Sequence, residues 1–256
     1  MRCVILHYHI FKNAGSTVED ILANTFFEQF ARYDTPNFDD VLSQDEIVAY
    51  LERDQSLKAF SSHQIRYPMP EKAGYLFFDW CVLRSPVERL RSTYQYFRKK
   101  PFAGEPASDL ANQFGPGEFV ARMVRDYPYR INDVQVNLLA NGNNDEPPGE
   151  RDLARAIERM RGIALLGVVD CFNQSLIAGQ YFLRPVFPSL AVGQRAANVS
   201  DGKGVKFAEA CAPEVYAELQ RLNALDTRLL ELARKEVRRR FALVPDGAAR
   251  LAELER

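Results

Sequence analysis

Six consecutive residues near the amino terminus, Lys12-Asn13-Ala14-Gly15-Ser16-Thr17, have the types that bind an anionic group. A β-branched apolar run precedes them, and apolar side chains with helical spacing follow them. A strand-to-helix loop lies beside the unpaired N–H groups and the positive dipole end of its helix. Gly15 lets a backbone approach a ligand closely, and Ser16 and Thr17 can donate hydroxyl hydrogen bonds. The segment predicts a phosphate-binding loop; the alternative is a plain turn with a surface lysine.

The position of Lys12 differs from that in the phosphate loop of ATP-binding proteins. Their loop reads GxxxxGK[ST], with the lysine directly after the second glycine. Lys12 instead comes three residues before Gly15. A kinase that uses ATP is therefore the less favoured alternative, because the loop lacks the spacing that defines such kinases. The sequence also has no convincing carboxylate to bind magnesium.

A second candidate anion site combines Arg84 with Ser92. Arg84 ends an apolar run, and Ser85-Pro86 closes that run because proline suits the first turn of a helix. The bend that follows can bring the Arg84 guanidinium and the Ser92 hydroxyl to one phosphate. Arg89 lies between them and can pair with the ligand or with a neighbouring carboxylate. The alternatives are a structural salt bridge for Arg84 and an ordinary helical serine.

The order of the elements around these residues is typical of an α/β fold. Strands are expected at residues 3–9, 57–62, 75–84 and 162–170. Helices are expected at residues 18–32, 44–54, 87–98, 117–126, 133–140, 150–160, 172–183, 213–223 and 225–240. Residues 99–117 are expected to form a long surface loop and residues 184–206 an irregular one.

Such alternation predicts a central, mostly parallel sheet flanked by helices, with ligands at the carboxyl ends of the strands. Lys12, His63 and Arg84 each follow a predicted strand. We therefore expect these three side chains to gather at one edge of the sheet.

The composition favours a single globular domain over residues 1–256, with a core at about 3–240 and a tail at 241–256. Hydrophobic residues make up 46% and charged residues 26% of the chain, and the net charge is -1. That charge argues against a nucleic-acid partner. No apolar stretch approaches ~20 residues, so no membrane span is expected, and the amino terminus lacks the apolar region of a signal peptide. Four separate cysteines fit free thiols in the cytoplasm.

The two anion-binding segments resemble the PAPS-dependent sulfotransferases (PAPS is 3'-phosphoadenosine 5'-phosphosulfate). The similarity is to the branch with the heparan sulfate 2-O-sulfotransferases and bacterial and other carbohydrate sulfotransferases. HIFKNAGST (9–17) is similar to the family's HxPKTGGTS loop, and VLRSPVERLRSTY (82–94) to its RxPxxRxxSxY signature. Weaker similarities follow in the family's order at 61–67, 132–142, 165–176 and 222–233. Phe11, Asn13 and Ala14 depart from the usual Pro, Thr and Gly.

The resemblance implies a P-loop-NTPase-like sulfotransferase fold, PAPS as donor, its bisphosphate product PAP, and no metal. It implies that Lys12 to Thr17 bind the 5'-phosphosulfate and that Arg84 and Ser92 bind the 3'-phosphate. Phe172, Ser175 and Lys203 are further candidates near the nucleotide. For Ser175 the alternative is a helix cap, and for Lys203 a solvated charge.

Sulfuryl transfer needs a cation at the leaving oxygen and a base for the acceptor hydroxyl. Lys12 is the expected cation. His63 is the expected base, because histidine titrates near neutral pH and the resemblance places the family's histidine here. A structural role for His63, with Glu28 or Asp34 as base, is the alternative. His9 is expected to hydrogen-bond the loop, and His7 to pack.

The predicted function is sulfuryl transfer from PAPS to a hydroxyl-bearing acceptor, either a carbohydrate or a small metabolite. A catalytically inactive module that binds a nucleotide or a sulfated ligand is the main alternative. Whether residues 99–117 form a lid is left open by the sequence.

Overall fold

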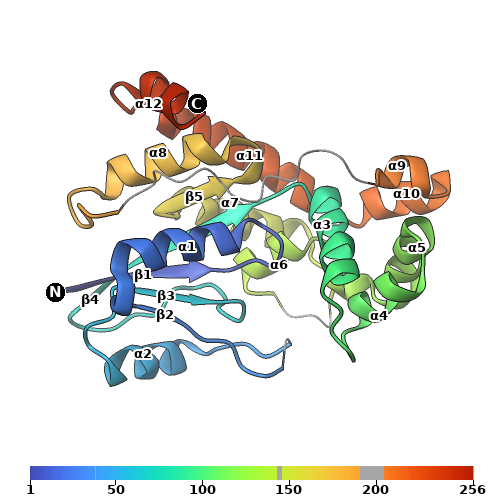
Figure 1. Cartoon of the computed structure of the whole chain (residues 1–256), viewed down its shortest axis with the longest axis horizontal. Coiled ribbons are helices and arrows are strands. Elements are labelled where there is room, and N and C mark those ends of the chain that lie inside the picture. Colours follow the sequence, from blue (N-terminus) through green and yellow to red (C-terminus); the bar gives the residue numbers. More distant parts are fainter. Residues whose placement is uncertain (38, 143–145, 191–204, 256) are drawn as a thin grey trace.

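A computed structural model of the chain describes residues 1–37, 39–142, 146–190 and 205–255. Its centre is a five-stranded parallel sheet with the order β2-β3-β1-β4-β5. The strands are β1 (Arg2–Tyr8), β2 (Phe30–Arg32), β3 (Ala59–Ser62), β4 (Tyr75–Leu83) and β5 (Leu165–Val168). Helices flank this sheet on both faces, so the predicted α/β class is confirmed (Figure 1).

The register of the three inner strands brings their carboxyl ends together. Tyr8, the last residue of β1, lies opposite Ser62 of β3 and Cys81 of β4. The residues that follow these strands therefore leave the sheet at one edge, as the sequence predicted for the segments around Lys12, His63 and Arg84.

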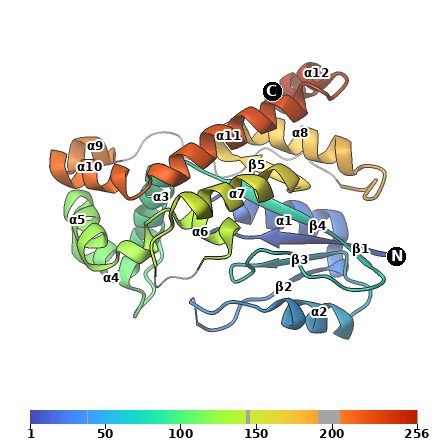
Figure 2. The ribbon, with the colours of Figure 1, turned by 180° about the vertical axis from the view of Figure 1, so that it is seen from behind.

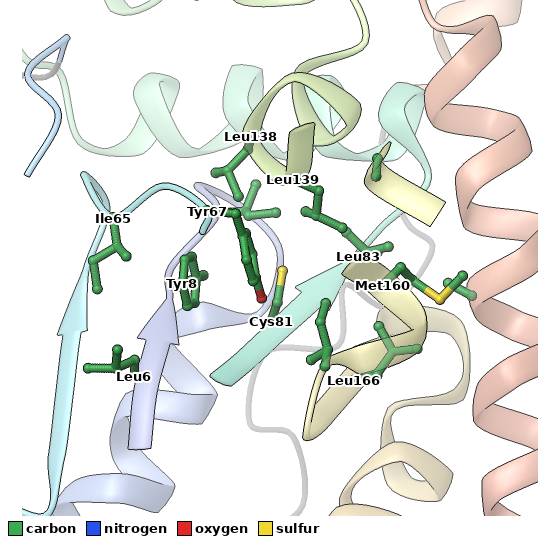
Figure 3. Packing of buried hydrophobic residues seen from close by; sticks show 14 of the residues in the cluster. Leu6, Tyr8, Ile65, Tyr67, Cys81, Leu83, Leu138, Leu139, Met160 and Leu166 are labelled. Atoms are coloured by element: carbon green, nitrogen blue, oxygen red, sulfur yellow. The ribbon is translucent and has the colours of Figure 1, made fainter. Parts of the chain in front are cut away.

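Alternate residues of β1 pack into two different cores. Ile5 faces α1 (Gly15–Phe26) and α8 (Phe172–Leu183), which cover one side of the sheet. Leu6 and Tyr8 face the other side, which is covered by α2 (Gln44–Arg53), α6 (Val134–Ala140), α7 (Glu150–Gly162) and α11 (Ala224–Phe241). Figure 2 shows α7 and α11 across this second side, and Figure 3 shows Leu6 and Tyr8 among its packed side chains. This two-residue alternation is what a strand buried on both faces produces.

A group of helices extends the molecule beyond the carboxyl edge of the sheet (Figure 1). A separate apolar cluster holds them together, with Phe97, Phe119 and Phe207 among its members. The helices are α3 (Pro86–Lys99), α4 (Pro106–Gln113), α5 (Pro116–Asp126), α9 (Phe207–Ala210) and α10 (Pro213–Arg221).

Two expectations from the sequence are wrong. Residues 99–117 do not form one long loop, because they contain α4 and the start of α5. Pro106 and Pro116 each stand in the first turn of a helix, where proline costs no hydrogen bond. The periodic burial of Ala107 and Ala111 then holds α4 against the helical layer.

The helix expected at 18–32 ends early. α1 stops at Phe26, a 3₁₀ turn spans Phe27–Gln29, and β2 follows. Phe27 has a φ of 49°, which ends the helix, and its side chain is 76% exposed. The apolar pattern of the sequence therefore continues past the point where the helix ends. Pairing of β2 with β3 outweighs the helical propensity of the segment.

The remaining elements complete the covering layers. The expected tail at 241–256 contains a helix, α12 (Gly247–Leu254), which packs against α8. Short 3₁₀ turns occur at Pro128–Arg130 and Val169–Cys171. Within the described residues, no helix has the length and apolarity needed to cross a membrane.

Candidate active site

The loop between β1 and α1 is bent by two residues in the left-handed region of backbone space. Lys12 has a φ of 64° and Ala14 a φ of 61°. Each such residue costs roughly 1–2 kcal/mol when it carries a Cβ. Ala14 stands directly before α1 and gives it no side-chain cap, so the first N–H groups of this helix rely on other partners. Glycine at position 14 would avoid the cost of the left-handed conformation.

Asn13 fixes the loop to the sheet. Its side chain is 1% exposed, and Nδ2 donates to the carbonyl of Val82 and to Oε1 of Gln135, both at 2.8 Å. Its backbone N–H donates to the carbonyl of Ile10 at 3.1 Å. Asn13 was expected to contact the donor, but its side chain is bonded inside the protein and its visible role is to hold the loop.

Gly15 is required by a contact that the sequence did not reveal. A Cβ at this position would lie 1.9 Å from Cδ2 and 2.0 Å from Nε2 of His9. The His9 ring therefore occupies the space beside the first turn of α1, and its Nδ1 hydrogen-bonds Oε1 of Glu19 at 2.8 Å. The His9 side chain thus bonds the helix after the loop, close to the role expected for it.

Gln135 connects the anion loop to the second candidate segment. Its Oε1 accepts the backbone N–H of Arg84 at 2.9 Å, and its Nε2 donates to the Arg84 carbonyl at 2.9 Å. Nε2 also donates to Oδ2 of Asp226 at 3.0 Å, and Asp226 is fully buried. With Asn13, these bonds join β4, α6, α11 and the loop. The sequence had shown residues 132–142 and 222–233 only as weak similarities.

Two cations lie together at the start of α1. Nη1 of Arg84 donates to the backbone carbonyl of Lys12 at 2.8 Å, and Nζ of Lys12 lies 4.3 Å from the centre of the Tyr96 ring. Neither side chain forms an ion pair with a carboxylate in the described part of the chain. Burial and the charge of Arg84 lower the pKa of Lys12, and burial lowers the pKa of Arg84. A bound anion would relieve both effects.

The hydroxyl residues that were expected to bind the sulfuryl donor differ in how exposed they are. Ser16 is exposed and Thr17 is buried in the first turn of α1. Ser92 is half-buried on α3, beside Arg91, which pairs with Glu88. Arg91 is 7% exposed, and the sequence gave no signal for its burial.

The residues expected near the nucleotide at β5 lie in packed surroundings. Phe172 is buried in the core between the sheet and α8. The Ser175 hydroxyl accepts from the backbone N–H of Val168 at 3.1 Å and donates to the carbonyl of Cys171 at 2.9 Å. A hydroxyl bond to the carbonyl four positions earlier is a bond within the helix, and the N-cap residue of α8 is Cys171, so Ser175 is not the helix cap that the alternative expected. Lys203 lies outside the described residues.

His63 is held at the same edge by three contacts. Its Nδ1 lies 2.7 Å from the carbonyl oxygen of His9, its backbone N–H donates to Oδ1 of Asp34 at 2.8 Å, and its ring lies 3.8 Å from the His9 ring. A carbonyl only accepts, so Nδ1 carries the proton and Nε2 is the basic nitrogen. Burial, then His9, lowers the pKa of His63 to about 4. Neutral His63 is therefore the form present at neutral pH.

The carboxylates considered as alternative bases are placed differently. Asp34 is bonded to the backbone of His63 and to the Ser62 hydroxyl, so it orients the histidine segment. Glu28 lies in the turn after the twelve-residue α1, on the order of 18 Å along the helix from the anion loop. This position is remote from the carboxyl edge of the sheet, where His63 and Asp34 lie.

A buried cluster of His7, His9 and Glu19 lies behind His63, with ligand-type atoms within 4.8 Å of one another. Nδ1 of His7 bonds the Ser61 hydroxyl at 2.9 Å, and that hydroxyl donates to Glu19 at 2.8 Å. Burial would raise the pKa of Glu19, but the bonds from His9 and Ser61 outweigh it and lower that pKa. These bonds account for the cluster as a support for the His9 ring. That the reaction needs no metal stays a prediction.

A pocket of about 200 Å³ opens beside His63. Its wall includes Phe11 and Phe97, and its polar lining includes Arg66, Arg89 and Arg130. The Phe11 ring lies 6.0 Å from the His63 ring and 5.7 Å from Nζ of Lys12, so this wall residue is a neighbour of both the candidate base and the loop lysine.

No protein-family model matches the chain. The chain is 26% identical over 203 residues to an uncharacterized protein of Archaeoglobus fulgidus. The match covers 77% of this chain and 80% of the archaeal protein. That protein's description names no activity.

Proposed function

We propose that this protein is a PAPS-dependent sulfotransferase that acts on a hydroxyl of a carbohydrate or small-metabolite acceptor. The observation that carries the proposal is the pair of uncompensated cations, Lys12 and Arg84, at the first turn of α1. The His63 base lies at the same edge of the sheet. The two motifs that resemble the family's donor segments support the nucleotide assignment.

The reaction follows from these positions. The acceptor oxygen attacks sulfur, and the bond from sulfur to the 5'-phosphate oxygen breaks. The bond's electron pair leaves on that phosphate oxygen as PAP, and the hydroxyl proton passes to Nε2 of His63. Lys12 stabilises the charge on the leaving oxygen, and its partial burial strengthens that interaction. Arg84 and Ser92 bind the 3'-phosphate.

A reducing compartment such as the cytoplasm fits the four free cysteines of the chain. Cys81 is buried, and burial raises the pKa of its thiol, which keeps it unreactive. The cysteines therefore have no part in the proposed reaction.

The test is PAP formation from PAPS in the presence of a panel of hydroxyl acceptors. Lys12→Met and His63→Gln should each lower the acceptor-dependent rate by on the order of 10²-fold or more, because each removes a group that acts on a reacting atom. Lys58→Met, at an exposed lysine, is the matched control. Unchanged turnover in both site variants would overturn the assigned roles.

One observation favours a second function, a binding module without catalysis. Ala14 holds a left-handed conformation at a position where the resembled family has glycine. A Cβ there narrows the loop where the phosphosulfate would lie. PAP binding without PAPS turnover across the acceptor panel would support this alternative.

A further inference from the structure

Arg89 is a buried cation whose charge has no partner among the described residues. It lies on α3, is 7% exposed, and lines the pocket beside His63. Its Nε is buried without a hydrogen-bond acceptor, and no carboxylate of the described chain lies within ion-pair distance of it. Glu88, one position before it, pairs with Arg91 instead.

The carboxylate with the largest effect on the charge of Arg89 is that of Asp226, and its oxygens already accept hydrogen bonds from other groups. It accepts the backbone N–H groups of Gln135 and Val136 at 3.2 and 2.8 Å and the Gln135 amide at 3.0 Å. Burial lowers the pKa of Arg89, and the opposing effect of Asp226 does not cancel it. A buried guanidinium without a bonded anion is destabilising, so an anion that entered the pocket would be bound strongly.

The other two arginines of the pocket differ from Arg89. Arg130 is neutralised by Glu105 at 3.0 Å and by Asp39 at 3.1 Å. Arg66 forms no ion pair with a carboxylate in the described ranges of the chain, and its Nη1 donates to the carbonyls of His63 and Ile65 at 3.2 and 3.1 Å. Both acidic side chains that line the pocket are therefore bound to Arg130, which leaves Arg89 and Arg66 as the cations that can attract an anionic ligand.

Most of the remaining pocket wall is apolar, apart from the two histidines, Thr93 and Tyr129. Its carbon surface comes from side chains of α3, α5, α6 and the loop before Lys12, namely Phe11, Leu90, Phe97, Met123 and Leu138. A volume of about 200 Å³ lies below the range of about 300–1,000 Å³ that is typical of sites for drug-sized ligands. The pocket therefore fits a small molecule with an apolar body better than a polysaccharide.

We propose that this pocket is the acceptor site and that its acceptor is a small hydroxy acid with an apolar, aromatic body. The hydroxyl lies at Nε2 of His63, the ring lies against Phe97 and its apolar neighbours, and the acid group binds Arg89 with help from Arg66. This inference rests on the proposed sulfotransferase function and narrows its acceptor class. The reaction is the balanced transfer described above, with the hydroxy acid supplying the attacking oxygen.

The test is calorimetric binding of 4-hydroxybenzoate, 4-hydroxyphenylacetate and 3-(4-hydroxyphenyl)propionate to the free and the PAP-bound protein. The neutral amide of each acid is the matched ligand. At least one acid should bind about tenfold or more tightly than its amide, because the acid alone can bond a charged donor. Equal affinity of acid and amide would overturn the inference.

Variants separate the role of Arg89 from a general effect of charge. Arg89→Met should reduce the preference for acid over amide to about twofold or less, and Arg89→Lys should restore part of it. Arg89→Met removes an unpaired buried charge, so it should fold. Arg125→Met on α5, an exposed residue paired with Asp126, is the control and should keep the preference.

The outcomes also distinguish this inference from the proposed function. Binding of PAP with no acid bound by either form of the protein would overturn the acceptor class but not the sulfotransferase. A preference for the acid that survives Arg89→Met would overturn the role of Arg89. Failure of PAP to bind would contradict the donor site. Binding of the acids and amides to the free protein would still test whether the pocket prefers an acid.

Discussion

Nδ1 of His63 lies 2.7 Å from the backbone carbonyl oxygen of His9, which sets the proton on Nδ1 and leaves Nε2 as the basic nitrogen. His9 thus orients the candidate base with its backbone, and its ring lies against the base with the two ring planes tilted by 35°. The same His9 ring fills the space beside Gly15, so one residue connects the base to the anion loop. His9 is a positioning residue, because the proposed chemistry occurs at His63.

The first prediction concerns the pH at which His63 gains a proton. The chain has three histidines, so their ring protons can be followed separately by NMR. Burial lowers the pKa of His63 to about 4, so its resonance should titrate about two units below that of an ordinary histidine. His63 should stay unprotonated from pH 8 down to about pH 5. The value of kcat/KM should therefore not fall near pH 6.5, where an ordinary histidine base would gain its proton. His63→Gln identifies the resonance, and a midpoint at or above 6.5 would contradict the described environment.

Donor binding should change the same signal in a defined direction. A phosphosulfate or phosphate close to the ring stabilises the protonated form, so PAP should raise the pKa of His63. The spectrum of Lys12→Met provides the comparison, because this variant should bind PAP weakly. A titration midpoint that PAP leaves unchanged would place the nucleotide away from His63.

The second prediction concerns the affinity for PAP. Arg84→Ala removes a guanidinium that bonds the Lys12 carbonyl and is proposed to bind the 3'-phosphate. A hydrogen bond to a charged group contributes about 1.5–3 kcal/mol, so the dissociation constant for PAP should rise on the order of 10- to 100-fold. The affinity for 5'-AMP, which lacks the 3'-phosphate, should change less. Arg53→Ala at the end of α2 is the exposed control. An equal loss of affinity for PAP and for 5'-AMP in Arg84→Ala would show that Arg84 does not bind the 3'-phosphate.

The third prediction compares two neighbouring positions in the anion loop. Gly15→Ala places a Cβ 1.9 Å from the His9 ring, so it should destabilise the protein and displace His9. Ala14→Gly removes a Cβ from a left-handed residue and should stabilise the protein by ~1 kcal/mol. Urea unfolding measures both changes. Equal effects at the two positions would show that the loop has a different backbone from the one described.

The fourth prediction concerns Gln135 as the link between segments. Gln135→Ala leaves the Arg84 backbone and the Asn13 amide without their buried partner. The loss of several buried hydrogen bonds should lower the free energy of unfolding by roughly 2–4 kcal/mol. The matched control is Gln44→Ala, which removes an exposed amide with one long hydrogen bond of 3.3 Å. A decrease in the free energy of unfolding as small as that of the control would show that Gln135 does not stabilise the link between these segments.

Much of the fold follows from patterns that are local in the sequence. The runs that became β1, β4 and β5 are rich in aliphatic or aromatic residues, and the loops after β1 and β4 carry the residues expected at a ligand edge. The three-residue β2 was missed because the apolar period of α1 continues through Phe30. The helix α4 was missed because Pro106 and Gly104 indicated a loop, although proline also begins helices.

The site was harder to predict because its supporting bonds join residues that are far apart in the chain. Asn13 bonds Gln135 across 122 positions, and Asp226 bonds the same amide across 91. A single sequence carries no signal for such pairs. For Arg89 the reason is different: Glu88 could pair with either neighbouring arginine of the helix, and only the fold shows that it pairs with Arg91 while Arg89 is buried at the pocket.

The most direct test of the donor site is thermal unfolding with PAP, with 5'-AMP and ATP–Mg as controls. A ligand at 100 times its dissociation constant adds ~2.7 kcal/mol, which raises the unfolding temperature by roughly 5–10 °C for a chain of this size. We predict that PAP gives this shift and that 5'-AMP and ATP–Mg give much smaller ones. A shift with ATP–Mg alone would indicate a kinase, and no shift with PAP would contradict the proposed donor site.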